Sequence, residues 1–240
     1  MIGNLNVYWW QHVGAMVVVA AGRLDATSYN SLRDTLAKVA AEAPRAVLVD
    51  LNEMRVCDRN ALALFPAVGA EIAIWPGIPL LLVTANEANH RMLLDYRMRR
   101  YLPVHRSIEA ATDGIATPPP RRVARVDLPN GVISSGLAHE FVTEWCERWQ
   151  VTAELTVSAA RVATALVGNT MKHTYGPPTI RIELRRGVMS VAVYDGDPEQ
   201  PHLIGPGTGT ENGLTMIDHL CRAWGSARTP SGGKVVWATL

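Results

Sequence analysis

In the first half of the chain, short apolar runs alternate with segments of helical spacing. Met16–Ala21 and Ala46–Leu51 are apolar runs without alternation, which is typical of strands buried on both faces. Between them, apolar residues recur at helical spacing from Leu32 to Ala40, and Pro44 ends that helix. The same pattern predicts a helix around Leu64–Ile72, a strand at Leu80–Thr84 and a helix over Glu87–Arg100. This order predicts an α/β layer in which helices cover a sheet.

In the second half, helices are grouped before strands, which is typical of an α+β domain. The pattern predicts helices at Ser134–Trp149 and Ala153–His173, then strands at Ile180–Leu184 and Val188–Tyr194. A loop rich in Gly, Thr and Pro follows, and then a helix at Leu214–Arg222 and a strand at Val235–Leu240.

Three consecutive prolines, Pro118 to Pro120, separate the two halves. They disfavour both a helix and a central strand and stiffen the chain. We therefore expect a domain at residues 1–113, a linker at 114–126 and a second domain at 127–240.

Composition excludes several classes of protein. The 240 residues are 48% hydrophobic, and 23 Lys and Arg balance 22 Asp and Glu, which argues against a disordered chain and against a polyanion binder. Cys57, Cys146 and Cys221 form no CxxC pair, so neither a disulfide framework nor a zinc site is expected. No apolar run approaches the roughly 20 residues of a membrane span, and the first residues lack the pattern of a signal peptide. We expect a cytoplasmic protein without a membrane contact.

Three features of the second half occur in an informative order. Asn169 lies near the end of a long predicted helix, Asp195 and Gly196 directly follow an apolar strand, and a glycine-rich segment leads into a further helix. In this order they resemble the ATP-binding domain of the GHKL superfamily, which includes histidine kinases, gyrase and anti-sigma factor serine kinases. The resemblance is strongest to the serine kinases, extends over about residues 121–240 and implies an α+β sandwich of the Bergerat type.

The resemblance implies a site for ATP or ADP with Mg²⁺. Asn169 is expected to present its side-chain oxygen to Mg²⁺, and Asp195 to accept a hydrogen bond from the exocyclic amine of adenine. The remaining residues expected to bind nucleotide are the glycines of the lid and of the following helix start, together with a lysine that can reach phosphate: Gly205, Gly207, Gly209, Gly213 and Lys234. For Lys234, a solvated surface lysine is the alternative.

Two positions depart from the kinase pattern. The kinases carry a glutamate four residues before the Asn as general base, and this chain has Ala165 there. Losing a positioned base typically costs roughly 10²–10⁴ in rate. Glu211 and Asn212 stand before Gly213 where the family usually has Gly and Arg, and an acidic residue near phosphates disfavours nucleotide. We therefore assign no catalytic residue.

A loop in the first half carries a second resemblance. Asp58, Arg59, Asn60 and Ala61 follow a predicted strand and open a helix, and Asp58 is a good N-cap. With Gly22–Asp25, this segment is similar to the signature loop of STAS domains, the fold of anti-sigma factor antagonists, over about residues 13–112. Regulated members of that family read Asp-Ser-Ser-Gly and are phosphorylated on the second serine. Asn60 matches that serine and has no hydroxyl, so the loop is a degenerate phosphoacceptor.

The sequence thus favours a regulator of the partner-switching type without phosphotransfer. The expected partners are a sigma factor, an anti-sigma factor or an antagonist, with a contact between the STAS-like and ATP-binding domains within one chain or a dimer. One alternative is an active serine protein kinase that acts on a separate antagonist. Another is a nucleic-acid-binding regulator that uses the basic residues from Arg97 to Arg106, although a solvated helix end explains them as well. The adjacent Trp9 and Trp10 suggest a contact surface.

Overall fold

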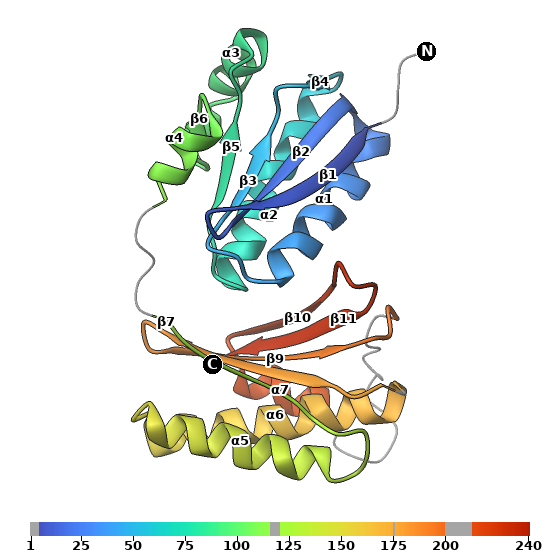
Figure 1. Ribbon diagram of the computed structural model, residues 1–240, viewed down its shortest axis with the longest axis vertical. Coiled ribbons are helices and arrows are strands. Elements are labelled where there is room, and N and C mark those ends of the chain that lie inside the picture. Colours follow the sequence, from blue (N-terminus) through green and yellow to red (C-terminus); the bar gives the residue numbers. More distant parts are fainter. Residues whose placement is uncertain (1–4, 116–120, 175, 200–212) are drawn as a thin grey trace. The chain divides into compact units, whose positions relative to one another are not determined.

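The computed structural model describes residues 5–115, 121–174, 176–199 and 213–240 of the chain. The chain forms two compact units, Met1–Pro118 and Pro119–Leu240, here called unit 1 and unit 2 (Figure 1). The division falls inside the segment expected to be a linker. Among the described residues, no helix has both the length and the apolar character needed to cross a membrane.

Unit 1 is built on a mixed sheet with the strand order β1-β2-β3-β5-β6, and β4 pairs with β2. The pairs β2–β3, β2–β4, β3–β5 and β5–β6 are parallel, whereas β1 runs antiparallel to β2. The strands are β1 (Asn6–His12), β2 (Ala15–Leu24), β3 (Val47–Asp50), β4 (Met54–Val56), β5 (Leu80–Val83) and β6 (Val104–His105). The buried central strands explain the unbroken apolar runs of the sequence.

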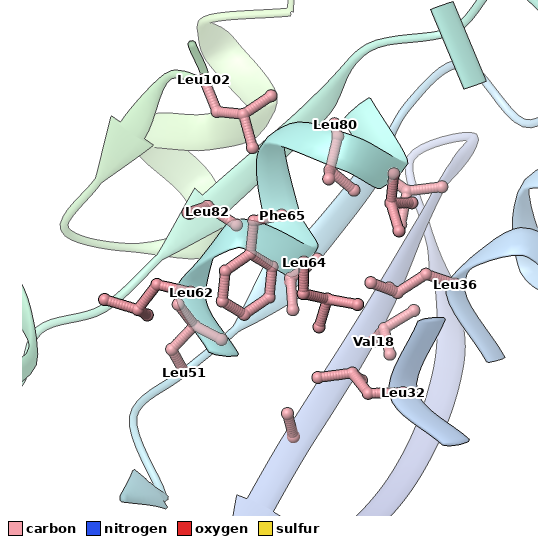
Figure 2. Packing of buried hydrophobic residues seen from close by; sticks show 14 of the residues in the cluster. Val18, Leu32, Leu36, Leu51, Leu62, Leu64, Phe65, Leu80, Leu82 and Leu102 are labelled. Atoms are coloured by element: carbon pink, nitrogen blue, oxygen red, sulfur yellow. The ribbon is translucent and has the colours of Figure 1, made fainter. Parts of the chain in front are cut away.

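Helices pack on both faces of this sheet. They are α1 (Ala26–Ala41), α2 (Leu64–Ile74), α3 (Glu87–Asp95) and α4 (Ile108–Asp113), with 3-10 turns η1 (Arg59–Ala63) and η2 (Met98–Arg100). The larger core lies between the sheet and helices α1 and α2, where Leu36, Phe65 and Leu82 are fully buried (Figure 2). A smaller core on the other face joins Ala111 of α4 to Val17.

Unit 2 is an antiparallel sheet covered by helices on one face (Figure 1). Its strand order is β10-β11-β9-β8-β7. The elements are β7 (Arg121–Asp127), α5 (Ser134–Arg148), α6 (Ala153–His173), β8 (Thr179–Arg185), β9 (Val188–Asp195), α7 (Gly213–Leu220), β10 (Ala223–Arg228) and β11 (Lys234–Thr239). Met189, Val191 and Val193 of β9 lie in one core with residues of α5 and α6.

Several elements differ from the sequence-based expectation. Residues up to 126 were assigned to the linker, but Arg121–Asp127 forms β7, the outer strand of unit 2. Strands β1, β4, β6 and β10 and helix α4 were not predicted. The expected helix Glu87–Arg100 ends at Asp95, because Arg97 adopts a left-handed conformation with φ of 57°. Outer strands are short or half exposed, so they lack the apolar run that marks a central strand.

Candidate functional site

The Asp195 carboxylate lies at the end of β9, on the face of the sheet that α6 covers. Side chains of a strand alternate between faces, so Asp195 follows Val191 and Val193 toward the helices. Its side chain is 0% exposed. A buried carboxylate needs hydrogen-bond donors or a cation, because its desolvation is costly. The groups around Asp195 therefore show whether its charge and its hydrogen-bonding capacity are satisfied within unit 2.

The two oxygens of this carboxylate have different surroundings. Oδ1 accepts from Nζ of Lys234 at 2.9 Å and from the backbone N–H of Asp197 at 2.9 Å. Oδ2 is buried and has no hydrogen-bond partner among the described residues. A buried acceptor without a donor costs about 1–3 kcal/mol. One side of Asp195 is thus held in place, and the other fits a ligand that brings an N–H or O–H donor.

Lys234 is held in place by the pairing of two strands. It stands opposite Asp195 in the register of β11 and β9, and its Nζ also donates to the backbone oxygen of Asp197 at 3.0 Å. Its side chain is 5% exposed, so it is not a solvated surface lysine. The phosphate contact stays a prediction; in this structure the ammonium group is bound to Asp195.

Gly233 permits this close packing. A Cβ atom built on Gly233 would lie 1.9 Å from the backbone oxygen of Asp195 and 2.9 Å from Cα of Gly196. No side chain can be accommodated at such distances without displacement of the backbone. Gly233 therefore brings β11 against the end of β9 and sets the position from which Lys234 reaches the carboxylate.

Asn169 and Ala165 lie four residues apart on α6, the helix that packs against β9. That spacing places them on one face of the helix. Both are half buried, and Ala165 packs against the core of unit 2. Thr170, next to Asn169, has a buried Oγ1 without a hydrogen-bond partner among the described residues. At Ala165 this face offers a methyl group and no proton acceptor.

The glycine-rich segment falls mostly outside the described residues. Gly205, Gly207 and Gly209 lie there, together with Glu211 and Asn212. Gly213 is the first residue of α7, as expected for a glycine that opens this helix.

The residues present fit ATP or ADP with Mg²⁺ in two respects. The bare Oδ2 of Asp195 matches the amine N–H donor of adenine, and the side-chain oxygen of Asn169 is a ligand type that Mg²⁺ accepts. Lys234 is engaged by Asp195, so it is not placed as a free cation for phosphate. Ala165 supplies no general base on this face of α6.

The loop of unit 1 that follows β4 is the second candidate site. Asp58 caps η1 by accepting from the backbone N–H of Asn60 at 2.9 Å, which confirms its predicted capping role. Asn60 and Arg59 are exposed. A surface depression of about 380 Å³ lies next to this loop. Its lining combines the loop with one face of α3: Arg59, Ala88, Arg91, Met92 and Asp95.

The contribution of α3 to this surface was missed in the sequence. Asn89 anchors the helix, because its buried Nδ2 donates to the backbone oxygens of Leu51 at 2.7 Å and Met54 at 2.9 Å. Asn86 caps α3 and is itself linked to Asn52, whose Oδ1 accepts from the N–H of Asn86 at 3.3 Å. The spacing of Ala88, Met92 and Asp95 is the only local signal that they share a helix face.

The basic segment considered for nucleic acid is partly engaged within unit 1. Arg106 pairs with Glu87 at 2.9 Å, and Arg99 and Arg100 belong to η2.

Comparisons with known proteins find similarity in solved structures. No protein-family model matches the chain, and no curated protein matches its sequence. An anti-sigma factor antagonist from Mycobacterium paratuberculosis is 18% identical, with a TM-score of 0.42 over 47% of this chain and 94% of that chain. The antagonist SpoIIAA in its unphosphorylated form is 13% identical, with a TM-score of 0.37 over 46% and 94%. RsbS from Moorella thermoacetica is 17% identical, with a TM-score of 0.38 over 45% and 93%. The chain is thus similar to anti-sigma factor antagonists over about half of its length.

Proposed function

We propose that the chain is a regulatory protein of the partner-switching kind. Unit 1 acts as an antagonist-like module, and unit 2 binds ATP or ADP with Mg²⁺ and transfers no phosphate. The partners are a sigma factor, an anti-sigma factor or an antagonist protein. Nucleotide in unit 2 changes which of these partners the chain holds.

The observation that carries the nucleotide part is the bare Oδ2 of Asp195. It is buried and has no donor among the described residues, while Oδ1 of the same group has two. A protein retains such an unsatisfied oxygen at a cost, and a ligand that supplies the donor recovers that cost. The exocyclic amine of adenine supplies an N–H of this kind. Asn169 would hold Mg²⁺ through its amide oxygen, and the ion would offset the negative charge of the phosphates.

Binding is favoured over phosphotransfer by two side chains. Ala165 stands where a general base is needed and packs against the core, so no carboxylate is available at this position. Asn60 stands exposed where an acceptor hydroxyl is needed, and an amide cannot be phosphorylated in its place. Asn60 is neutral, as an unmodified serine is, so unit 1 is held in the partner-binding form whether or not a kinase is present.

The presence of both units in one chain adds to the proposal. A short connection raises the effective concentration of one module near the other to about the millimolar range. Within one chain, a contact between an antagonist-like and an ATP-binding module therefore forms readily even where the affinity is low, and two exchanged contacts between two copies reinforce one another in the same way. Nucleotide or an external partner then acts by displacing this contact.

Calorimetric titration of Mg-ATP and Mg-ADP into the full chain tests the nucleotide site. We expect saturable binding to the wild type and at least about tenfold weaker binding to Asp195→Ala. The matched control is Asp197→Ala, two residues away, whose side chain is half exposed and accepts only from the N–H of Glu199 among the described residues. This control is expected to bind as the wild type does, and circular dichroism checks that each variant is folded.

Two results contradict the proposal. Absence of binding to the folded wild type removes the nucleotide site, and equal binding to the wild type and Asp195→Ala removes Asp195 from it. Phosphopeptide mass spectrometry after incubation with Mg-ATP tests the second half of the proposal. A phosphorylated residue in the wild-type chain shows that phosphotransfer is retained.

A further inference from the structure

The outermost strand of unit 1 carries three consecutive exposed aromatic residues. Tyr8 is 51% exposed, and Trp9 and Trp10 are each 40% exposed. The rings of Tyr8 and Trp10 stack with their centroids 6.1 Å apart and their planes inclined by 22°. Exposed aromatic side chains that lie together are enriched at protein interfaces. This set, Tyr8, Trp9 and Trp10, is called the β1 aromatic strip.

The β1 aromatic strip occupies both faces of the sheet at one edge. Trp9 pairs with Val18, whose side chain belongs to the core under α1 and α2. Tyr8 and Trp10 pair with Val19 and Val17 on the opposite face. On that face α4 contacts β3, β5 and β6, toward the far edge of the sheet. The strip is therefore suited to a partner that approaches the edge itself and contacts both faces.

The backbone of β1 offers an edge for such a partner. All seven residues of β1 pair with β2 in one continuous register, without a bulge or a proline. Among the described residues, no strand pairs with the other side of β1. An edge strand of this kind is a template for a further strand unless charge or irregular geometry blocks it.

Charge distinguishes β1 from the other outer strands. Asn6–His12 contains no Asp, Glu, Lys or Arg. The outer strand β7 of unit 2 carries Arg121, Arg122 and Arg125, and β10 ends in Arg228. The other strands of unit 1 that pair on one side only are short: β4 has three residues and includes Arg55, and β6 has two. Like charges that face one another across two strands oppose pairing. Among the outer strands described, β1 is the only long one without charged residues.

We propose that β1 pairs antiparallel with β1 of a second copy of this chain, about a twofold axis through Trp9. In this register Trp9 faces the partner's Trp9, and Tyr8 faces the partner's Trp10. The three aromatic residues are symmetric about Trp9, and none of the seven pairs contains Asp, Glu, Lys or Arg, so the strand complements itself. The two sheets of unit 1 become one continuous sheet. A twofold contact of this type needs one self-complementary patch on each copy.

The contact rests on cross-strand aromatic pairs and on the backbone ladder. Aromatic pairs across antiparallel strands are among the more stabilising pairs of a sheet. Backbone hydrogen bonds supply the rest, as in other complexes in which a strand is added to a sheet edge. The dimer therefore forms as the concentration rises and does not depend on nucleotide in unit 2.

Sedimentation equilibrium of the full chain, from about 1 to about 200 µM, tests the proposal. We expect a monomer–dimer equilibrium for the wild type. Trp9→Lys and Trp9→Glu each place two like charges across the twofold axis, so each raises the dissociation constant at least about tenfold. An equimolar mixture of the two variants brings Lys opposite Glu and restores dimers. The matched control is Val157→Lys, at an exposed apolar position on α6, which leaves the equilibrium unchanged.

Three outcomes overturn the proposal. They are a wild type that stays monomeric over this range, a dimer that neither Trp9 variant weakens, and a mixture that associates no better than its components. A further measurement uses only the wild type, so its result does not depend on whether the variants fold. Amide hydrogen exchange of β1 is expected to slow as protein concentration rises, and exchange that is independent of concentration contradicts the contact.

Discussion

The ammonium nitrogen of Lys234 lies 2.9 Å from Oδ1 of Asp195, and both side chains are almost completely buried. The two residues are 39 positions apart in sequence and face one another across β11 and β9. The pair neutralises the Asp195 carboxylate on one side and leaves its other oxygen without a donor among the described residues. This asymmetry links the stability of unit 2 to its proposed nucleotide site.

Lys234→Met is expected to destabilise unit 2 by about 3–5 kcal/mol, because it leaves a buried carboxylate without its cation. Urea denaturation followed by circular dichroism measures this change. The double variant Asp195→Asn with Lys234→Met removes both charges and is expected to recover most of the loss. A single variant as stable as the wild type, or losses that add in the double variant, contradicts a coupled buried pair.

Gly233→Ala is expected to destabilise unit 2 by roughly 1–3 kcal/mol, because the new methyl group meets the backbone oxygen of Asp195. It is also expected to weaken nucleotide binding, since the end of β9 must shift. Gly196→Ala is the matched control, because a Cβ there meets no atom within 4 Å. Thermal unfolding and calorimetry compare the two. Equal effects of both substitutions show that the close approach at Gly233 is unimportant.

Acidification is expected to destabilise unit 1 through His90. Burial lowers the pKa of the His90 imidazole below its ordinary value of 6.5; the positive charges of Arg106 and Arg99 lower it further, and Glu87 opposes this. The unfolded chain then binds a proton more readily than the folded one. The contribution of His90 to the stability of unit 1 is therefore fully present above pH 6.5, the pKa of the imidazole in the unfolded chain. It is lost as the pH falls from there toward the lower pKa in the folded chain.

The measurement is the midpoint of urea denaturation at about pH 7.5 and about pH 5.5. His90→Gln is expected to show a smaller change between the two conditions than the wild type. Burial also lowers the pKa of His105, so part of the pH dependence of stability remains in the His90→Gln variant. A wild-type midpoint that rises on acidification contradicts the assigned direction.

Ala165→Glu is expected to raise ADP production from Mg-ATP if unit 2 is otherwise intact. A carboxylate four residues before Asn169 supplies the missing proton acceptor, and a positioned base is worth roughly 10²–10⁴ in rate. Ala165→Gln is the control, because it has nearly the same shape and no carboxylate. ADP release at the same low rate in both variants shows that the defect lies elsewhere, whereas rapid turnover by the wild type supports the kinase alternative.

The central elements of both units follow from local patterns in the sequence. The buried strands β2, β3 and β5 coincide with apolar runs, and α6 (Ala153–His173) has the bounds expected from helical periodicity. Such patterns are local, because the burial of a central strand or of one helix face determines the spacing of apolar residues within that element. The outer strands β1, β7 and β10 were not predicted, since half-exposed strands repeat no strong pattern.

The candidate site, like the fold, is predictable from the sequence only in part. Asn60 and Ala165 can be interpreted from the sequence alone, because each conclusion depends on a functional group that the residue lacks. The sequence by itself determined which groups are present and in which order along the chain. Only the tertiary structure decided that Lys234 binds Asp195, that α3 lines the depression beside Arg59, and that Trp9 lies on an open edge. The physical reason is that a polar or aromatic side chain takes its partner from the register between strands and the packing of helices, which bring together residues far apart in the chain.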